Sequence, residues 1–397
     1  MPELLTLEVA LERILGHAKP LPVETVAIGE AHGRVVREPA RAAVDLPPFP
    51  SSAMDGFAVR ASETPGELPV AFRVAAGHAP PGALPPQAAA GIATGGTVPD
   101  GADAVVPVEL AEDRDGRVVI PAAAGPAQHV RPRGGDVHEG DVVVAPGMRL
   151  GAAQIGALAA AGIAEVRCSV RPRVTILATG SELRPPGEML EPGQIYESNR
   201  SMIAAALAGS GAEIDVLPVV TDDIEAHRAA IARGLEADAL VTSGGVSMGP
   251  HDLVRRIAAE LGVEEVFWGV AVKPGKPLSF GVRGETLMFG LPGNPVSSLV
   301  GALVFVRPAL LARQGLASPM PAYSCGRLAA PLRRNAHRDE FVRARCSETT
   351  NGPILEAIVG QESHMIARAA AADSLIHVPR GAGEIAAGEQ VRYLPLV

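Results

Sequence analysis

The strongest constraint on the fold is a pattern between residues 171 and 313, where short apolar runs end in glycine and helix-like segments follow. VTILAT (174–179) is followed by Gly180, and DALVTS (238–243) runs into Gly244 and Gly245. This alternation predicts a mostly parallel sheet covered by helices on both faces. We expect further strands at 214–219, 266–270 and 287–289, and helices at 198–208, 222–235, 251–261 and 295–313.

The chain on either side of this block favours short strands, because brief apolar runs alternate with many Gly and Pro residues. A helix is expected after Thr6 and an Ala-rich one at 150–163, and Thr6 and Thr221 are the expected N-caps of the helices that follow them. The expected strands of the β-rich lobe are 57–60, 70–75, 104–108 and 118–120, and those near the end of the chain are 340–345, 354–358, 375–378 and 390–394.

Composition excludes several classes of protein. The 397 residues carry a formal net charge of −9, which argues against a nucleic-acid binder held by general phosphate attraction. Three cysteines without a CxxC pair argue against a disulfide framework or a thiolate zinc site, and fit a reducing cytoplasm. The start lacks the marks of a signal peptide and no apolar run reaches ~18 residues, so we expect no membrane span.

Loops that follow the expected strands are the first candidates for a binding site, because open α/β sheets bind ligands at the carboxyl ends of their strands. SGGVSMGPHD (243–252) offers backbone N–H groups at Gly244 and Gly245 and the hydroxyls of Ser243 and Ser247, which suit a phosphate or another oxyanion. The alternative is that the glycines only form a tight turn. The loop lacks both GxxxxGK[ST] and GxGxxG.

Two further groups follow the same strands. Asp252 can hold Mg²⁺ between phosphate oxygens, or it can simply cap a helix. In LPGNP, exposed N–H groups near Asn294 can bind an oxyanion, although Asn294 as cap and Pro295 in the first turn are also sufficient structural reasons for the motif.

Lysine is scarce in this chain, which makes KPGKP (273–277) informative. Only three of the 35 basic residues are lysines, and two of them, Lys273 and Lys276, lie three residues apart between prolines. A stiff turn holds two ammonium groups near one another, and an anionic ligand offsets their repulsion. The alternative is a pair of solvated lysines on a turn.

Three motifs of the β-rich lobe are weak on their own. Asp55 lies in SAMDGF, Thr94 opens TGGTVPDGAD, and Asp136 ends RPRGGD. Each fits an ordinary turn as well as a ligand contact.

The ordered set of motifs is far more specific than any one of them. Together they closely resemble the MoeA/gephyrin E-domain family, the molybdopterin molybdenumtransferases, from about residue 5 to the C-terminus. The motifs are DLPPF, SAMDGFA, TGGTVPDGADAVV, RPRGGD, RPRVTILATGSEL, GQIYESNR, SGGVSMGPHD, VAVKPGKPLSF and FGLPGNPVSS.

The resemblance implies an α/β multidomain fold and an elongated homodimer. A linker-like N-terminal domain is expected at 1–51 and 137–170, with part of 20–45 packed on the central domain, and a β-rich domain at 52–136. A mostly parallel α/β molybdopterin-binding domain is expected at 171–316, and a small C-terminal β-barrel at 317–397.

The reaction implied by the resemblance inserts molybdenum from molybdate into adenylylated molybdopterin, with Mg²⁺, and releases AMP and molybdenum cofactor. Both substrates are anionic, so positioning and charge neutralisation are the main requirements. The implied partners are the two substrates and, transiently, other proteins of cofactor synthesis, with no nucleic acid and no membrane.

Site residues carry over position by position from the resemblance. The implied catalytic residues are Asp252, Lys273, Lys276, Asp55 and Asp136. The implied substrate-binding residues are Thr94, Glu182, Ser243, Gly244, Gly245, Ser247, Pro292, Gly293, Asn294 and Pro295. Asp252 and Asp222 are the implied metal ligands.

Four positions depart from the family pattern, and two other functions stay open. Gly135 stands where Glu is usual, Gly96 where Ala is usual, Leu253 where an aromatic is common and His364 where Arg is frequent. A molybdopterin adenylyltransferase uses the same α/β domain, and one relative in the family is also a scaffold for membrane receptors. The β-rich lobe and the KPGKP lysines favour the metal-inserting enzyme.

Overall fold

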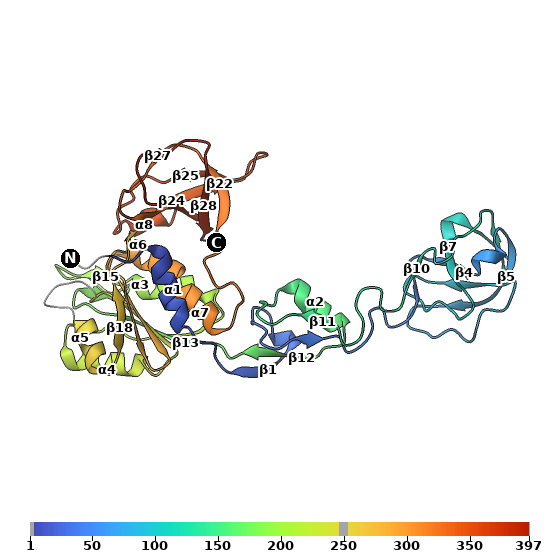
Figure 1. Cartoon of the computed structure of the whole chain (residues 1–397), viewed down its shortest axis with the longest axis horizontal. Helices are drawn as coiled ribbons and strands as arrows, with labels where there is room; N and C mark the ends of the chain where they lie inside the picture. The colour runs from blue at the N-terminus through green and yellow to red at the C-terminus, as the bar shows by residue number, and fades with distance from the viewer. Residues whose placement is uncertain (1–3, 246–252, 397) are drawn as a thin grey trace. The chain divides into compact units, whose positions relative to one another are not determined.

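The structure is a computed structural model that describes residues 4–245 and 253–396. The chain divides into two compact units, which are considered separately (Figure 1). The first comprises Met1–Glu24, Gly33–Val35 and Ser169–Val397, and the second comprises Thr25–His32 and Val36–Cys168.

A six-stranded sheet forms the centre of the first unit. Its order is β16 (Glu213–Val216), β13 (Arg173–Ala178), β17 (Ala239–Ser243), β21 (Thr286–Leu291), β20 (Ser279–Arg283) and β18 (Glu264–Trp268). The first four strands are parallel, as the alternating pattern predicted. Strand β20 was not expected, and it pairs antiparallel with both β21 and β18.

Helices cover both faces of this sheet, which confirms the prediction. One face packs on α1 (Leu7–His17), α3 (Asn199–Ala208) and the long helix formed by α6 (Pro295–Gly301), the π-helical η4 (Ala302–Val306) and α7 (Arg307–Arg313). The other face packs on α4 (Ile224–Gly234) and α5 (Leu253–Glu260). Alternate strand residues enter the two cores: Val241 lies in the first and Leu240 in the second.

Two helix starts test the expected caps. The Thr6 side chain accepts a hydrogen bond from Val9 N at 3.3 Å and caps α1, as predicted. The expected cap at Thr221 is wrong, because Asp223 is the N-cap of α4 and its carboxylate accepts from Ala226 N at 2.8 Å. A carboxylate at this position also interacts favourably with the positive end of the helix.

The placement of α1 differs from the expected domain division. Residues 1–51 were expected to share a domain with 137–170, but α1 lies in the first unit and packs against α7. Its residues Leu7, Leu11 and Ile14 are buried in the same core as the central sheet. Burial of this apolar stripe assigns the helix to the α/β core.

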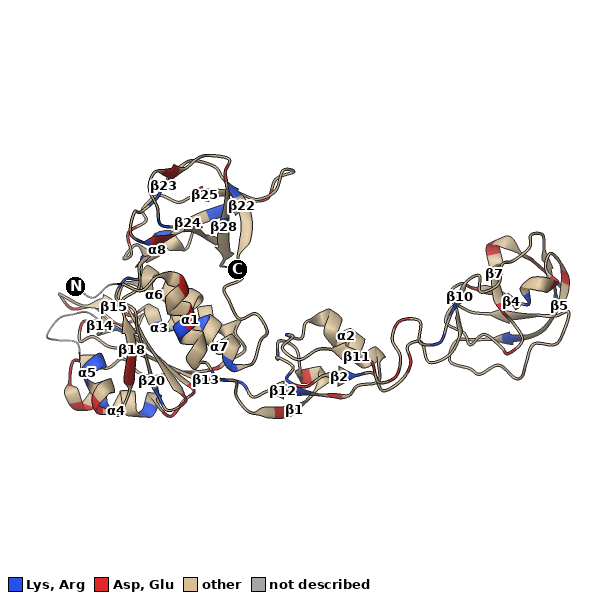
Figure 2. Ribbon diagram, viewed as in Figure 1, with Lys and Arg blue, Asp and Glu red and all other residues tan. Residues whose placement is uncertain are grey.

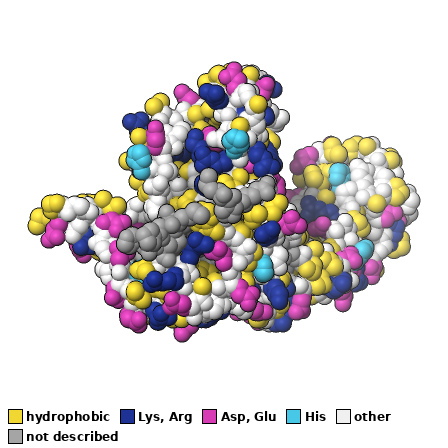
Figure 3. Space-filling view, turned by 60° about the vertical axis from the view of Figure 1, so that its left-hand side comes forward, with side chains coloured by type: hydrophobic (Ala, Val, Ile, Leu, Met, Phe, Trp, Pro, Cys, Tyr) yellow, Lys and Arg dark blue, Asp and Glu magenta, His cyan; other side chains and the backbone are white. Residues whose placement is uncertain are grey.

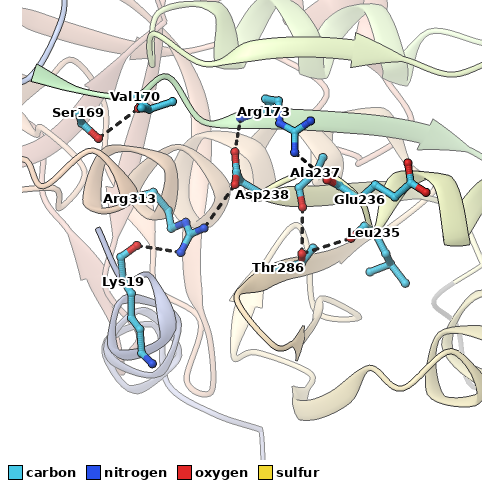
Figure 4. A network of polar contacts seen from close by, with 10 residues as sticks. All are labelled: Lys19, Ser169, Val170, Arg173, Leu235, Glu236, Ala237, Asp238, Thr286 and Arg313. Atoms are coloured by element: carbon cyan, nitrogen blue, oxygen red, sulfur yellow. Dashed lines mark hydrogen bonds and ion pairs between the residues drawn. The ribbon is translucent and has the colours of Figure 1, made fainter. Parts of the chain in front are cut away.

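A polar network fastens the ends of the strands opposite to their carboxyl ends (Figure 4). The buried Arg313 guanidinium donates to Lys19 O at 2.8 Å and lies 3.6 Å from Asp238 Oδ1. The other oxygen of that carboxylate accepts from Arg173 N at 2.7 Å. Helix α7, the segment after α1 and strand β13 are therefore held together by two hydrogen bonds and an ion pair.

The long helix over Pro295–Arg313 is apolar enough to cross a membrane by length and composition alone. In this structure 67% of its most apolar window is buried inside the protein. Its residues Val304, Phe305 and Leu310 belong to the core of the first unit. Charged side chains lie instead on outer helices such as α4 and α5 (Figure 2), where Arg228 pairs with Glu260.

The C-terminal residues form a closed β-barrel, as expected. Five strands follow one another around the barrel, and pairing of the first with the last closes it. They are β24 (Asp339–Ser347), β25 (Ile354–Ala357), β22 (Ser324–Leu328), β28 (Gln390–Pro395) and β26 (Ser374–Val378). The short strand β19 (Val272–Lys273) pairs with β24 from outside.

The second unit contains a six-stranded sheet, which agrees with the predicted β-rich lobe. Phe57 and Val59 point into one core and Ala58 into another, so the sheet is buried on both faces. The order is β7 (Ala104–Pro107), β4 (Gly56–Val59), β6 (Ala89–Ile92), β5 (Gly66–Val74), β9 (Arg117–Ile120) and β8 (Glu112–Arg114). A smaller core surrounds α2 (Ala152–Ala160), with Leu158 fully buried.

Candidate active site

A pocket of about 570 Å³ lies at the carboxyl ends of β13, β17 and β21. Three loops line it: the one after β13, the one after β17 and the one between β21 and α6. Eight residues expected from the sequence are among those that line it: Glu182, Asp222, Ser243, Gly244, Gly245, Pro292, Gly293 and Asn294.

Buried side chains join two of these loops. The Asn199 amide donates to Ser243 Oγ at 2.8 Å and to Gly293 O at 2.7 Å. Ser243 is 2% exposed, and its hydroxyl lies 3.3 Å from both Pro292 O and Ser298 Oγ. The hydroxyl of Ser243 is therefore engaged in holding the loop between β21 and α6.

Gly244 and Gly245 are required by the backbone itself. Their φ angles are +92° and +65°, a region that side-chain-bearing residues rarely adopt. A Cβ at Gly244 would lie 2.8 Å from Thr179 O, and one at Gly245 would lie 2.6 Å from Val254 Cγ2. The tight turn and the binding of an oxyanion are therefore compatible interpretations of this motif, because the turn exposes backbone groups at the pocket.

Acidic groups line the opposite side of the pocket. Ser181 and Asp222 join the loop after β13 to the segment before α4 by paired hydrogen bonds: Asp222 N donates to Ser181 Oγ at 3.0 Å, and Asp222 Oδ2 accepts from Ser181 N at 3.2 Å. The Glu182 carboxylate lies over Gly180, where a Cβ would come within 2.5 Å of Glu182 Oε2. Oxygen ligands for a hard cation are therefore available here.

The described residues contain no group of three or more His, Cys, Asp or Glu side chains that could enclose a metal ion. Ser247 and Asp252, which the resemblance assigns to substrate and metal, lie outside the described residues. Mg²⁺ commonly binds one or two carboxylates together with substrate phosphates and water. Asp222 and Glu182 fit that mode, which depends on the substrate to complete the site.

Neither expected lysine is among the described residues that line the pocket, although the adjoining Pro277 is. Lys273 Nζ lies 3.0 Å from Glu340 Oε1 on barrel strand β24. Lys276 is half-buried, and its carbonyl accepts from Val270 N at 3.0 Å. The sequence grouped both lysines with Ser243 in one crevice, whereas the structure pairs Lys273 with the barrel.

The barrel also reaches the loop between β21 and α6. Asn294 Nδ2 donates to Ser363 Oγ at 2.9 Å, and Val296 N donates to Ser363 O at 3.1 Å. The fully buried Arg343 holds the segment around Ser363 by donating to Gly360 O at 2.6 Å and Met365 O at 2.7 Å. Pro295 opens α6 at this point but does not appear among the described lining residues.

The remaining expected residues belong to the second unit. Thr94 N donates to Asp55 Oδ1 at 2.7 Å, so two of the weak motifs meet. Asp136 is exposed, and its amide donates to Leu46 O at 2.9 Å. Asp45 of DLPPF accepts from Glu139 N and Arg133 Nε, and these two contacts lower the pKa of its carboxyl.

Three of the pocket-lining residues that the sequence did not assign to the site have polar side chains. Asn199 lies within the quoted motif GQIYESNR but was given no role, Thr179 directly follows β13, and His227 is 2% exposed with Nδ1 2.9 Å from Asp223 O. In the sequence, Asn199 stands at the start of an expected helix, and helix capping alone explains an Asn at that position. Its contacts with residues 44 and 94 positions away exist only in the folded chain.

Models of three protein-family regions match consecutive parts of the chain. They are the MoeA N-terminal region (domain I and II) at residues 5–162, a probable molybdopterin binding domain at 175–312, and the MoeA C-terminal region (domain IV) at 326–396. The fold is therefore of the MoeA type along its whole length.

Relatives that match nearly the whole chain support the same family. A protein of Mycobacterium tuberculosis named molybdopterin molybdenumtransferase 2 is 38% identical over 387 residues, covering 94% of this chain and 95% of the relative. A molybdopterin molybdenumtransferase of Haemophilus influenzae is 34% identical, covering 99% and 98%. A solved molybdopterin biosynthesis MoeA protein from Pyrococcus horikoshii superposes with a TM-score of 0.85 at 27% identity, covering 98% and 99%. This chain belongs to the molybdopterin molybdenumtransferase family, and it is an enzyme.

Proposed function

We propose that the pocket inserts molybdenum from molybdate into adenylylated molybdopterin, with release of AMP and molybdenum cofactor. The observation that carries this proposal is the arrangement of backbone-amide loops at the carboxyl ends of β17 and β21, held by the buried contacts of Asn199 and Ser243. Backbone N–H groups at such a position bind phosphate without side chains.

Charge neutralisation is the main catalytic task, because adenylate, phosphate and molybdate all carry negative charge. Gly244 N donates to Leu291 O at 3.1 Å, so Gly245 is the glycine that offers its backbone amide to the phosphate end of the substrate. Pro292, Gly293 and Asn294 line the same space. Lys276 supplies a positive charge next to Pro277, which lines the pocket. Asp55, Thr94 and Asp136 are proposed to act on the same substrate from the β-rich lobe.

Mg²⁺ is proposed as the divalent cation, with Asp222 and Asp252 as ligands and Glu182 nearby. When bound, such an ion neutralises phosphate charge and polarises the bond to the leaving group. Of these residues, the structure describes Asp222, and its Oδ2 accepts a hydrogen bond from Ser181 N at 3.2 Å. That contact holds the side chain in place before a ligand arrives.

We further propose a cytoplasmic homodimer that meets other proteins of cofactor synthesis transiently. The cysteine usage supports a reducing compartment, since no disulfide joins Cys168, Cys325 or Cys346. The adenylyltransferase alternative is not favoured, because relatives named as molybdenumtransferases match nearly the whole chain.

The direct test is incubation of the purified protein with adenylylated molybdopterin, Mg²⁺ and molybdate, with AMP and molybdenum cofactor measured over time. The expected result is release of AMP that requires molybdate and Mg²⁺, with equivalent formation of cofactor. If the protein instead forms adenylylated molybdopterin from ATP, the adenylyltransferase assignment replaces this one.

A further inference from the structure

The KPGKP turn begins on the C-terminal barrel. Val272 and Lys273 of β19 pair in parallel with Asp339 and Glu340 of β24, and Asp339 N donates to Ala271 O at 2.9 Å. The segment that enters the turn is therefore part of the barrel's hydrogen-bonded sheet, while Pro277 at its other end lines the pocket. Any group that fixes the start of the turn also fixes the approach of Lys276 to the pocket.

Glu340 is that group. Its Oε1 lies 3.0 Å from Lys273 Nζ and 3.1 Å from Asn335 Nδ2, so one carboxylate oxygen accepts from two side chains. The Glu340 side chain is only 15% exposed, whereas that of Lys273 is 51% exposed. A carboxylate held in this way has one orientation, and the charge of Lys273 is already balanced before any anion binds.

Lys276 differs from Lys273 in this respect. Within residues 4–245 and 253–396, no carboxylate lies within ion-pair distance of Lys276, and its backbone is held by the bond from Val270 N. Basic side chains gather on the barrel (Figure 3), and Arg380 N lies 3.4 Å from Asp339 Oδ1 beside the same strand. Glu340 thus balances the charge of Lys273, the first lysine of the pair.

We propose that Glu340 is a positioning residue which holds Lys273 against the barrel and so directs Lys276 toward the oxyanion substrate. The two lysines then have different tasks: Lys273 fixes the turn and Lys276 binds the anion. This inference rests on the proposed function for the identity of the anion, but its test measures binding of inorganic molybdate to the full-length protein, independently of turnover.

A charge reversal separates positioning from direct binding. Lys273→Glu places two carboxylates together and is expected to weaken molybdate binding at least tenfold by titration calorimetry. The double variant Lys273→Glu with Glu340→Lys restores an ion pair across the same strands, and is expected to recover binding to within about threefold of the parent protein. Lys276→Ala is expected to weaken binding in every background.

Failure of the double variant to recover binding while it remains folded overturns the proposal, because a carboxylate at position 273 then repels the anion directly. Thermal unfolding checks folding, and an ion pair with a half-exposed lysine contributes little to it. Glu384→Gln is the matched control, since it removes an exposed barrel carboxylate. If the parent protein forms no cofactor but binds molybdate in this pattern, the proposed function fails and the positioning role stands. Absence of molybdate binding by the parent protein contradicts the positioning role as well.

Discussion

The side-chain amide of Asn199 donates to the hydroxyl of Ser243 across 2.8 Å, although the two residues are 44 positions apart in sequence. The same amide nitrogen also donates to Gly293 O at 2.7 Å. One side chain on α3 thus fixes the loops after β17 and β21 relative to each other. These bonds add to the contacts that the Ser243 hydroxyl makes with Pro292 O and Ser298 Oγ.

Asn199→Ala is expected to lower the free energy of unfolding by about 1–3 kcal/mol, because two buried acceptors lose their donor. The Michaelis constant for adenylylated molybdopterin is expected to rise roughly tenfold as the loops separate. Steady-state kinetics and urea unfolding measure the two effects. Ser201→Ala, on the exposed side of α3, is the control, and equal behaviour of the two variants contradicts the role of Asn199.

Gly244→Ala is expected to destabilise the protein by about 1–3 kcal/mol, because its φ is +92° and the new Cβ would lie 2.8 Å from Thr179 O. Gly293→Ala is the matched comparison, since a Cβ there meets nothing nearer than Gly244 Cα at 3.8 Å. Thermal unfolding of both variants provides the measurement. The prediction is wrong if Gly293→Ala unfolds at the lower temperature.

Lys276→Ala is expected to raise the molybdate concentration needed for half-maximal cofactor formation about tenfold, because a charge-assisted contact to the anion is lost. Lys19→Ala removes an exposed lysine from the end of α1 and controls for net charge. Titration of molybdate at saturating adenylylated molybdopterin gives the comparison. An unchanged requirement in Lys276→Ala would remove this lysine from the anion site.

Asp222→Asn is expected to raise the Mg²⁺ concentration for half-maximal AMP release about tenfold, because the amide can still accept from Ser181 N but carries no charge. Asp252→Asn is expected to abolish Mg²⁺-dependent AMP release with folding intact. Glu225→Gln, in the first turn of α4, is the control carboxylate. Wild-type Mg²⁺ dependence in both aspartate variants argues against metal binding by these residues.

Asp339 gives a pH prediction for the barrel. Burial raises the pKa of its carboxyl, but the hydrogen bond to His377, 3.0 Å away, the hydrogen bond from Arg380 N and the electrostatic attraction of both residues outweigh burial and lower the pKa. A carboxyl with a lowered folded-state pKa adds stability above its unfolded pKa, and this stability is lost as pH falls through the folded value.

Asp339→Asn is therefore expected to lower the free energy of unfolding by about 2 kcal/mol near neutral pH. The difference from the parent protein should shrink as the pH falls below the ordinary value of 3.8. Urea unfolding followed across the acid range measures this. A difference that stays constant with pH would mean that the Asp339 charge does not contribute.

Much of the architecture could be predicted from local pattern. Apolar runs with glycine ends predicted the parallel strands β13, β17 and β21, since a buried parallel strand must be apolar on both faces. Strand β20 was not predicted, because LSFGVR lies directly after KPGKP and resembles a continuation of that loop. The N-cap of α4 was predicted at Thr221, two residues before its actual position at Asp223. Thr and Asp are both favourable N-cap residues, and both types occur in this short stretch of sequence.

The candidate site was predictable only where one short motif contains it. SGG and LPGNP were identified from residue type and position, since glycines with positive φ and a Pro at a helix start have local causes. The contact between Lys273 and Glu340 has no local cause, because the two residues are 67 positions apart.

The sequence by itself determined which segments become strands and helices, which turns require glycine, and which family the ordered motifs resemble, because these depend on side-chain size, backbone freedom and spacing along the chain. Only the tertiary structure decided that Asn199 joins two loops, that Glu340 takes one of the two lysines, and that α1 packs in the α/β core. Those contacts join distant residues, and long-range packing and desolvation choose among partners that are equivalent in the sequence.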